Sequence, residues 1–378
     1  MTAVRGWSSL PSDLLREVSG RLSCERDLLH VRQVCCHWRS SASLPVAPYR
    51  PWVVASRARS NIVGPIGEHS LWLPRGLKRV HLAAAPRGLP YCYGAPRGGW
   101  LALGDDERKL ALWEPSSGAV IPLPPLARVI QVFLSADPES SRSGWVAVAS
   151  TQVFRDKSHG ISFWRPGDAA WVAAAEVRTR GRLRSVAFLG DRMYCMDECR
   201  SFAIYDLSDF RFRTTGSPPA LLRRNNATHL LVRLCNRRCG RHLHGTRGAQ
   251  FVACAGQMLL VVMFNPSHPS FAEVYRQGST PGQQLDLGER VTDLGGYSLF
   301  LGRGDAFALS PQEFPAVKGN CVYFVVHYNN PDIKDWVYVF DLQSDALEKF
   351  PFPQEHKEDP ANEWWPVSWF CPKRPISS

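Results

Sequence analysis

Four residues of one short segment have side chains that can bind zinc. Cys235, Cys239, His242 and His244 follow the pattern C-x3-C-x2-H-x-H, and thiolates and imidazoles are the usual ligands of structural zinc. The two histidines are one residue apart, so on a strand they would point to opposite faces, whereas structural zinc sites use a wider spacing. We therefore expect a solvated basic loop here, with no metal and no other cofactor.

The other candidates for catalytic chemistry are weaker. Gly302-Arg303-Gly304-Asp305 offers only G-x-G without a following helix pattern, which predicts a turn between strands rather than a phosphate-binding loop. Adjacent carboxylates, as in Asp105-Asp106 and Glu358-Asp359, lie in polar segments where opposed acid and base roles are not expected. Cys195 and Cys199 flank a predicted turn, and we expect structural rather than redox roles for them. No nucleophile, base and orienting group stand in a recognisable arrangement, so we expect a protein that is not an enzyme.

The composition is that of a folded protein from a reducing compartment. The chain has 378 residues, of which 44% are hydrophobic and 21% charged, and its net charge is +11. Its longest apolar stretch, residues 258–264, is far shorter than the roughly 20 residues of a membrane span, and the N-terminus has no basic segment followed by an apolar run. Eleven cysteines at irregular spacing do not suggest a disulfide scaffold. We expect a soluble protein of the cytoplasm, the nucleus or both, with no membrane contact.

The first fifty residues predict helices followed by a linker. Pro11 suits a first helical turn, and Leu14, Leu15 and Val18 recur at helical spacing. A second apolar stripe continues at helical spacing through Leu28, Val31, Val34, Cys35 and Trp38. Residues 43–51 hold three prolines in nine residues and cannot continue a helix. So small a helical unit either packs as a cap on the rest of the chain or docks a partner with its surplus apolar side chains.

The remaining 328 residues repeat one short pattern. An apolar residue, an aromatic, a polar residue and then Leu or Pro precede a turn in four places: Leu112-Trp113-Glu114-Pro115, Phe163-Trp164-Arg165-Pro166, Ile204-Tyr205-Asp206-Leu207 and Val339-Phe340-Asp341-Leu342. The aromatics are 51, 41 and 135 residues apart, and a period near 45 residues is typical of four-stranded propeller blades. An apolar run precedes each copy, so the pattern predicts strands joined by turns. At this period the segment would form six or seven blades.

Two blades that lack the pattern are expected in the 135-residue gap. One would use residues 251–254 with 259–264, and the other Val291 with residues 297–301. The predicted fold class is therefore α+β with more than one domain, a small helical unit followed by a mostly-β propeller.

Three tryptophans near the end of the chain have two interpretations. Trp364, Trp365 and Trp369 either lie on a last strand that closes the ring against an early blade, or form an exposed recognition rim. The sequence leaves both open.

The helical segment resembles an F-box along its whole length. The resemblance is carried by Leu10-Pro11, Leu14-Leu15, Asp27-Leu28-Leu29, Val31-Arg32-Gln33-Val34-Cys35 and Trp38-Arg39. An F-box is a three-helix module that binds a Skp1-like adaptor and, through it, a cullin ubiquitin ligase. The resemblance implies an F-box at residues 5–44 and a Pro-rich linker at 45–51. It also implies adaptor contacts through Leu10, Pro11, Leu14, Leu15, Leu28, Leu29, Val31, Val34 and Trp38.

The rest of the chain resembles the plant DUF295 domain, also described as a KIB1–4-type β-propeller. The resemblance is carried by LFLGRGDAFALSPQEFPAVKGNCVYFVV (299–326), VYVFDLQSDALEKFPFP and WWPVSWFCP, and GWLALGDDERKLALWEPSSGAVIPLPPL is similar to the start of that domain. The resemblance places a DUF295-type propeller at 52–378. It implies a non-catalytic substrate-recognition subunit of an SCF-type (Skp1–cullin–F-box) E3 ubiquitin ligase, whose propeller binds a target protein.

Almost all of the net charge lies in one segment. Residues 178–247 contain fifteen Arg, no Lys and five acids, so they supply +10 of the +11. Four arginines alternate there, which on a strand would place them on one face: Arg178, Arg180, Arg182 and Arg184. A basic insertion at 216–248 adds Arg223, Arg224, Arg237, Arg238 and Arg241. The segment is either a solvated loop or a surface for an acidic target protein; binding of nucleic acid or another acidic ligand is the less favoured alternative.

Overall fold

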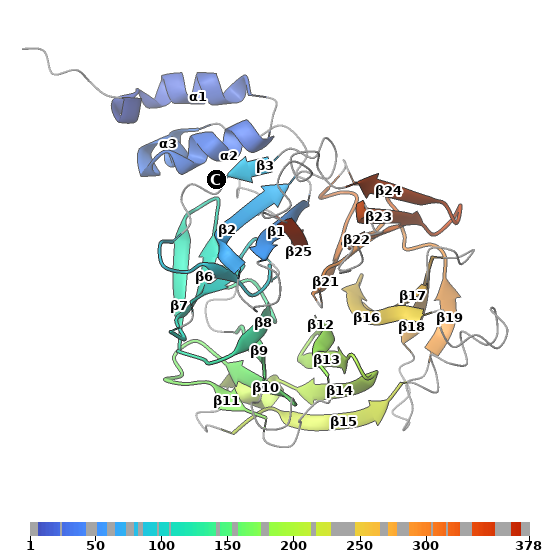
Figure 1. Ribbon diagram of the computed structural model, residues 1–378. Coiled ribbons are helices and arrows are strands. Elements are labelled where there is room, and N and C mark those ends of the chain that lie inside the picture. Colours follow the sequence, from blue (N-terminus) through green and yellow to red (C-terminus); the bar gives the residue numbers. More distant parts are fainter. Residues whose placement is uncertain are drawn as a thin grey trace, which may run out of the picture.

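The computed structural model begins with helices and continues as a ring of β-sheets (Figure 1). It describes residues 7–22, 25–42, 51–58, 65–72, 79–81, 86–96, 98–105, 107–140, 144–152, 158–174, 181–212, 217–227, 246–264, 271–277, 287–303, 305–314, 317–325, 335–351 and 364–371. No helix among these residues is long and apolar enough to cross a membrane.

The N-terminal helices form in the segment where the sequence predicts them. They are a short 3-10 helix η1 (Trp7–Ser9), α1 (Ser12–Gly20), α2 (Glu25–Gln33) and α3 (Cys36–Ser41). Pro11 is the N-cap residue of α1, where the absence of an N–H costs nothing. Leu15 and Ser19 are buried, and the Ser19 hydroxyl donates to the Leu15 carbonyl oxygen at 2.6 Å. A contact of 2.7 Å between His37 Nε2 and the Leu10 carbonyl oxygen ties α3 to the start of the unit.

The predicted second apolar stripe is interrupted between α2 and α3. α2 ends at Gln33, and Cys35 is extended (φ −165°, ψ 172°) and caps α3, its sulfur accepting from the Trp38 backbone N–H at 3.4 Å. Val34 therefore lies between two helices and is 54% exposed. On one continuous helix it would have faced the same side as the rest of the stripe.

The described strands pair into six sheets, named first to sixth in chain order. The first contains β25 (Trp364–Phe370), β1 (Trp52–Ala58), β2 (Pro65–Trp72) and β3 (Arg79–His81). The second contains β4 (Tyr91–Cys92), β5 (Leu101–Gly104), β6 (Leu110–Glu114) and β7 (Ala119–Leu123). The third contains β8 (Val129–Leu134), β9 (Ala147–Gln152), β10 (His159–Trp164) and β11 (Val172–Ala173).

The later sheets continue the same arrangement. The fourth contains β12 (Leu183–Leu189), β13 (Arg192–Asp197), β14 (Ser201–Asp206) and β15 (Ala220–Asn226), with α4 (Ser208–Phe212) between the last two. The fifth contains β16 (Thr246–Cys254), β17 (Gln257–Phe264), β18 (Ala272–Gln277) and β19 (Leu287–Val291). The sixth, with five strands, contains β21 (Ala306–Leu309), β20 (Ser298–Leu301), β22 (Cys321–Val325), β23 (Asp335–Asp341) and β24 (Leu347–Pro351).

The ring closes because the last strand joins the first sheet. β25 pairs antiparallel with β1, and Trp52 stands opposite Phe370. Trp369 is 1% exposed, so ring closure, one of the two interpretations of the C-terminal tryptophans, is confirmed for this residue. The side chains of Trp364 and Trp365 lie outside the described residues.

Both faces of the sheets are buried, because each sheet shares an apolar cluster with each of its neighbours. Consecutive residues of a strand point to opposite faces. Phe163 therefore packs against Tyr205 of the fourth sheet, with ring centroids 5.4 Å apart, while Trp164 packs beside Trp145 in the cluster shared with the second sheet. The repeated apolar–aromatic pair in the sequence thus supplies two different interfaces between sheets, which form the propeller.

The sheets correct the predicted assignment of blades in the 135-residue gap. Residues 251–254 and 259–264 fall in β16 and β17, as predicted for one blade. Val291, however, lies in β19 of that same sheet, and β20 pairs in parallel with β22 of the next sheet. The gap is long because β15 ends at Asn226 and β16 begins only at Thr246. It therefore holds one sheet of its own rather than two, and the described residues form no seventh sheet.

Candidate functional site

The helix α1 presents apolar side chains to solvent. Leu14 is 48% exposed and Val18 is 51% exposed, and residues four apart lie on one face of a helix. In Figure 1, α1 lies on the side of the helical unit that is away from the ring of sheets. The unit is therefore more than a cap on the propeller, because it leaves apolar surface uncovered. We call Leu14 and Val18 the α1 face.

The residues predicted to contact an adaptor differ in exposure. Pro11, Leu14 and Val34 are exposed. The others with some exposed surface are Leu10, Val31 and Trp38. Leu15 is 1% exposed, so it packs inside the unit and offers no surface to a partner, which corrects its predicted role. The side chains of Leu28 and Leu29 lie outside the described residues.

Two exposed apolar residues of this unit were not among the predicted contacts. Val18 follows Leu14 at i+4, a spacing that would have identified it. Trp7 is 78% exposed, and its carbonyl oxygen accepts a hydrogen bond from Trp38 Nε1 at 2.9 Å. Trp7 precedes the first helical pattern, so periodicity alone gave it no role.

Of the arginines predicted to form a basic surface, the structure describes three side chains. Arg182 is half-buried, and Arg184 and Arg224 are exposed. β12 begins at Leu183, so Arg182 precedes the strand and shares no regular strand face with Arg184. Arg224 lies on β15, three strand spacings or about 14 Å from β12 across the sheet. The other side chains lie outside the described residues: Arg178, Arg180, Arg223, Arg237, Arg238 and Arg241.

An arginine that was not predicted lies beside Arg184. Asp305 forms an isolated parallel β-bridge with Val186, and Arg303 lies close enough to Arg182 and Arg184 for their positive charges to lower its pKa. Arg184 Nη2 also forms an ion pair of 2.9 Å with Glu198 Oε1. The fold thus brings Arg303 and Asp305 of the predicted turn to the first half of β12. We call Arg182, Arg184 and Arg303 the arginine cluster.

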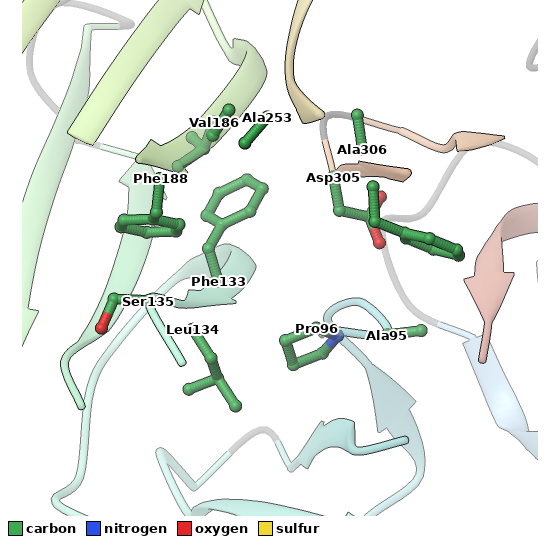
Figure 2. A pocket seen from close by; sticks show the side chains of 12 residues that line it. Ala95, Pro96, Phe133, Leu134, Ser135, Val186, Phe188, Ala253, Asp305 and Ala306 are labelled. Carbon is green, nitrogen blue, oxygen red and sulfur yellow. The ribbon is translucent and has the colours of Figure 1, made fainter. Parts of the chain in front are cut away.

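A small cavity lies between the inner strands of the ring (Figure 2). Its volume is about 40 Å³, enough for a few water molecules, each of which needs on the order of 10–15 Å³. The lining comes from β8, β12, β16, β21 and the segment after β4, and it is largely apolar, with Phe133, Val186 and Phe307 among its residues. Asp305 is the ionisable side chain among the lining residues. The sequence did not predict this cavity.

Asp305 connects distant parts of the ring. The Ser368 hydroxyl, on β25, donates to Asp305 Oδ2, and Asp305 Oδ1 has no hydrogen-bond partner among the described residues. The Gly302 N–H donates to the Asp305 carbonyl oxygen at 2.8 Å, and the Gly302 carbonyl accepts from Gln250 Nε2, on β16, at 2.9 Å. Burial raises the pKa of Asp305 to about 6, and the hydrogen bond from Ser368 opposes this only in part. These contacts tie the first, fourth, fifth and sixth sheets together at the cavity.

The two thiols predicted to be structural differ in burial. Cys195 is buried, and its burial raises its pKa to about 12, so the unreactive thiol form prevails. Cys199 is exposed, and neither cysteine forms a disulfide with another described cysteine. The residues of the zinc-like pattern lie outside the described part of the chain: Cys235, Cys239, His242 and His244.

Comparison with known proteins identifies both parts of the chain. A model of the F-box domain matches residues 7–46, and a model of the KIB1-4 β-propeller matches residues 70–351. No curated protein matches the chain significantly.

Solved structures add little to this assignment. Similar chains occur in two crystal structures of BBS1N in complex with ARL6DN, one soaked with mercury and one with lead, and both are 10% identical to this chain. The matches cover 78% and 82% of this chain and 74% and 78% of those chains, with TM-scores of 0.36 and 0.35. TM-scores this low do not support an assignment, whereas the family model of the KIB1-4 β-propeller matches most of the chain. The chain therefore belongs to the KIB1-4 β-propeller family, with an F-box domain ahead of its propeller.

Proposed function

We propose that this protein is a substrate receptor of an SCF-type ubiquitin ligase. F-box domains generally bind a Skp1-like adaptor and thereby a cullin, and domains of these two kinds typically act as adaptors without catalysis. The α1 face would dock on the adaptor, and the propeller would hold the protein to be ubiquitinated. The complex would work in the cytoplasm, the nucleus or both.

The exposed α1 face is the observation that carries this proposal. About half of the surface of Leu14 and of Val18 is exposed to water. Exposed apolar surface does not stabilise an isolated folded domain, whereas a partner that covers it gains binding energy. Burying the exposed half of each against an adaptor would contribute about 1 kcal/mol per side chain. Together they would supply about 2 kcal/mol, or about thirtyfold in affinity.

The experiment measures the affinity of the full chain for a recombinant Skp1-like adaptor by calorimetry. The double variant Leu14→Glu with Val18→Glu should lower this affinity at least about thirtyfold, because it removes the apolar contact and buries charge. Val120→Glu is the matched control, since Val120 is 49% exposed but lies on β7 of the propeller.

The outcomes separate the docking surface from the role itself. If the wild-type chain binds the adaptor and the double variant binds equally well, the α1 face is not the docking surface. If the wild-type chain does not bind the adaptor at all, the receptor role is wrong. Equal losses in the double variant and in Val120→Glu would indicate a general effect of added negative charge.

A further inference from the structure

Three guanidinium groups with little opposing charge meet at one end of β12. The parallel bridge between Val186 and Asp305 brings Arg303, which lies between β20 and β21 of the sixth sheet, close to Arg184 on β12 of the fourth. Arg182 precedes Arg184 by two residues, and its carbonyl oxygen accepts from the Glu198 N–H at 2.9 Å. The arginine cluster is therefore assembled from two sheets, and its members are held in place by backbone pairing.

Among the described residues, the acid bonded to the cluster is Glu198, and both of its carboxylate oxygens are engaged. Glu198 Oε1 pairs with Arg184 Nη2 at 2.9 Å, and Glu198 Oε2 accepts from the Arg182 backbone N–H at 3.4 Å. No acidic side chain among the described residues forms an ion pair with the guanidinium of Arg182 or Arg303. Three positive charges and one negative charge leave an excess of +2.

The charge state of Arg303 reflects this crowding. Arg303 is an exposed residue, but nearby protein atoms partly desolvate its guanidinium; this desolvation, followed by the positive charges of Arg182 and Arg184, lowers its pKa, while Glu198 raises it. Like charges held close together repel each other, and an anion placed between them relieves the repulsion. Guanidinium groups bind phosphate and carboxylate oxygens through two parallel hydrogen bonds.

We propose that the arginine cluster is an oxyanion-binding subsite, which takes a phosphate group or a run of carboxylates on a segment of the target protein. This proposal rests on the receptor role, and it names the chemistry that the propeller would recognise in its target. Arg182 and Arg303 would contact the oxyanion directly, while Glu198 holds Arg184 in position beside them. An engaged cluster would select targets that carry concentrated negative charge.

A protein segment fits this site better than a nucleic acid does. Proteins that bind single strands stack bases on aromatic side chains, and none of the propeller aromatics whose side chains the structure describes is exposed. Glu198 lies within the cluster and would repel a long continuous chain of phosphates more strongly than a short acidic segment of protein.

The experiment uses the full chain, with and without a recombinant Skp1-like adaptor, and fluorescein-labelled ten-residue peptides. One peptide carries a central phosphoserine, one carries three consecutive glutamates, and a parent peptide has neutral serine at those positions. Fluorescence polarisation is measured at about 50 mM NaCl, where surface charges are weakly screened. At least one acidic peptide should bind about tenfold more tightly than the parent peptide. Whether the phosphoserine peptide or the glutamate peptide binds shows whether the cluster recognises phosphate or carboxylate.

Charge-removing variants then locate the binding. The double variant Arg182→Gln with Arg303→Gln should lower the affinity for the acidic peptide at least about tenfold. Arg303→Gln alone should lower it about threefold, and because Arg303 is exposed this substitution should affect folding little. Arg192→Gln is the matched control, because Arg192 is exposed at the start of β13, opposite Leu189 at the far end of β12. Its effect should stay below about twofold.

Three results would overturn the proposal. The first is that the wild-type chain binds neither acidic peptide more tightly than the parent peptide. The second is that Arg192→Gln lowers the affinity for the acidic peptide as much as the double variant does. The third is that an oligonucleotide of equal charge binds more tightly than the peptides and loses its binding in the same double variant. Adaptor affinity, measured on the same variants, should be unchanged. A wild-type chain that binds the peptide but not the adaptor would contradict the receptor role and leave the subsite intact.

Discussion

The guanidinium of Arg39, on α3, lies directly against Gly118 in the turn between β6 and β7. A Cβ atom built at Gly118 would stand 3.1 Å from Arg39 Nη2. Arg39 also donates from Nε to the Arg32 carbonyl oxygen at 3.2 Å, so one side chain contacts both the F-box and the propeller. The F-box thus contacts the propeller through α3, whereas the exposed α1 face lies on a different helix.

Gly118→Asn should loosen this contact. Gly118 has φ +70°, a conformation that Asn tolerates better than other residues with a Cβ, so the turn is kept while the new side chain displaces Arg39. Hydrogen exchange of the α3 amides should become faster by about threefold or more. Gly190→Asn is the control, since Gly190 has φ +56° and open space around it. Equal exchange of α3 in both variants would show that the Arg39 contact does not hold the F-box.

Asp305→Asn should stabilise the protein at high pH. The pKa of Asp305 is about 6 in the folded protein, against a usual value of 3.8, so the folded state binds the proton more tightly. The carboxyl therefore stabilises the fold fully at pH below about 4, and this contribution is lost as the pH rises through about 6. About two pKa units correspond to about 3 kcal/mol. Urea unfolding should show similar stabilities at pH 4 and a more stable Asn variant at pH 8.

Asp341→Asn is the control of opposite sign. The hydrogen bond from Lys318, with Nζ 2.7 Å from Asp341 Oδ2, lowers the pKa of Asp341 to about 2. Ionised Asp341 therefore stabilises the fold above its usual pKa near 4, and the contribution is lost as the pH falls toward 2. Its Asn variant should be less stable than the wild type at pH 8. An Asp305→Asn variant that is also less stable at pH 8 would contradict the raised pKa of Asp305.

Gly302→Ala should destabilise the propeller because a methyl group has no room there. A Cβ at Gly302 would stand 2.5 Å from the Ser368 hydroxyl oxygen and closer still to Asp305 Oδ1. The expected cost is about 1–3 kcal/mol in the free energy of unfolding. In a background of Asp305→Ala with Ser368→Ala the same substitution should cost less than about 0.5 kcal/mol, because both obstructing atoms are gone. An unchanged cost in that background would assign the strain to the backbone instead.

Leu15→Ala and Leu14→Ala should have different consequences although the residues are adjacent. Leu15 is 1% exposed, so its truncation leaves a cavity and should cost about 2–5 kcal/mol in the stability of the F-box. Leu14 is 48% exposed, so its truncation should cost less than about 1 kcal/mol in stability and should weaken adaptor binding. Hydrogen exchange of α1, measured with and without adaptor, distinguishes the two. Equal destabilisation by both variants would contradict the assigned orientation of α1.

The repeated apolar–aromatic pattern could be found in the sequence because its aromatic side chains are buried in each blade. Trp113 and Tyr205 are each 1% exposed, and an aromatic at such a position recurs wherever a strand is packed on both faces. Strand pairing was not predictable, since the apolar pattern of β20 suits any neighbour. For that reason Val291 and residues 297–301 were assigned to one blade, although they belong to different sheets.

The candidate sites show the same limit. Helical spacing identified the apolar stripe of α1, but which of Leu14 and Leu15 faces inward depends on how the helix is rotated against α3. Arg303 has no basic neighbours in the sequence, and the parallel bridge between Val186 and Asp305 brings it to Arg184. Contacts between residues so far apart in the sequence cannot be predicted from a local sequence pattern.

The closure of the ring by β25 determines the order of events during translation. β1 and β2 are made early, yet the strand that completes their sheet follows about 290 residues later, which is roughly 15–60 s of synthesis. During that time the edge of β1 is unpaired and prone to association with other chains, while the F-box has already left the ribosome. A product truncated before Trp364 would keep its F-box without a closed propeller. With the proposed receptor role, such a product would compete for adaptor molecules without presenting a target protein.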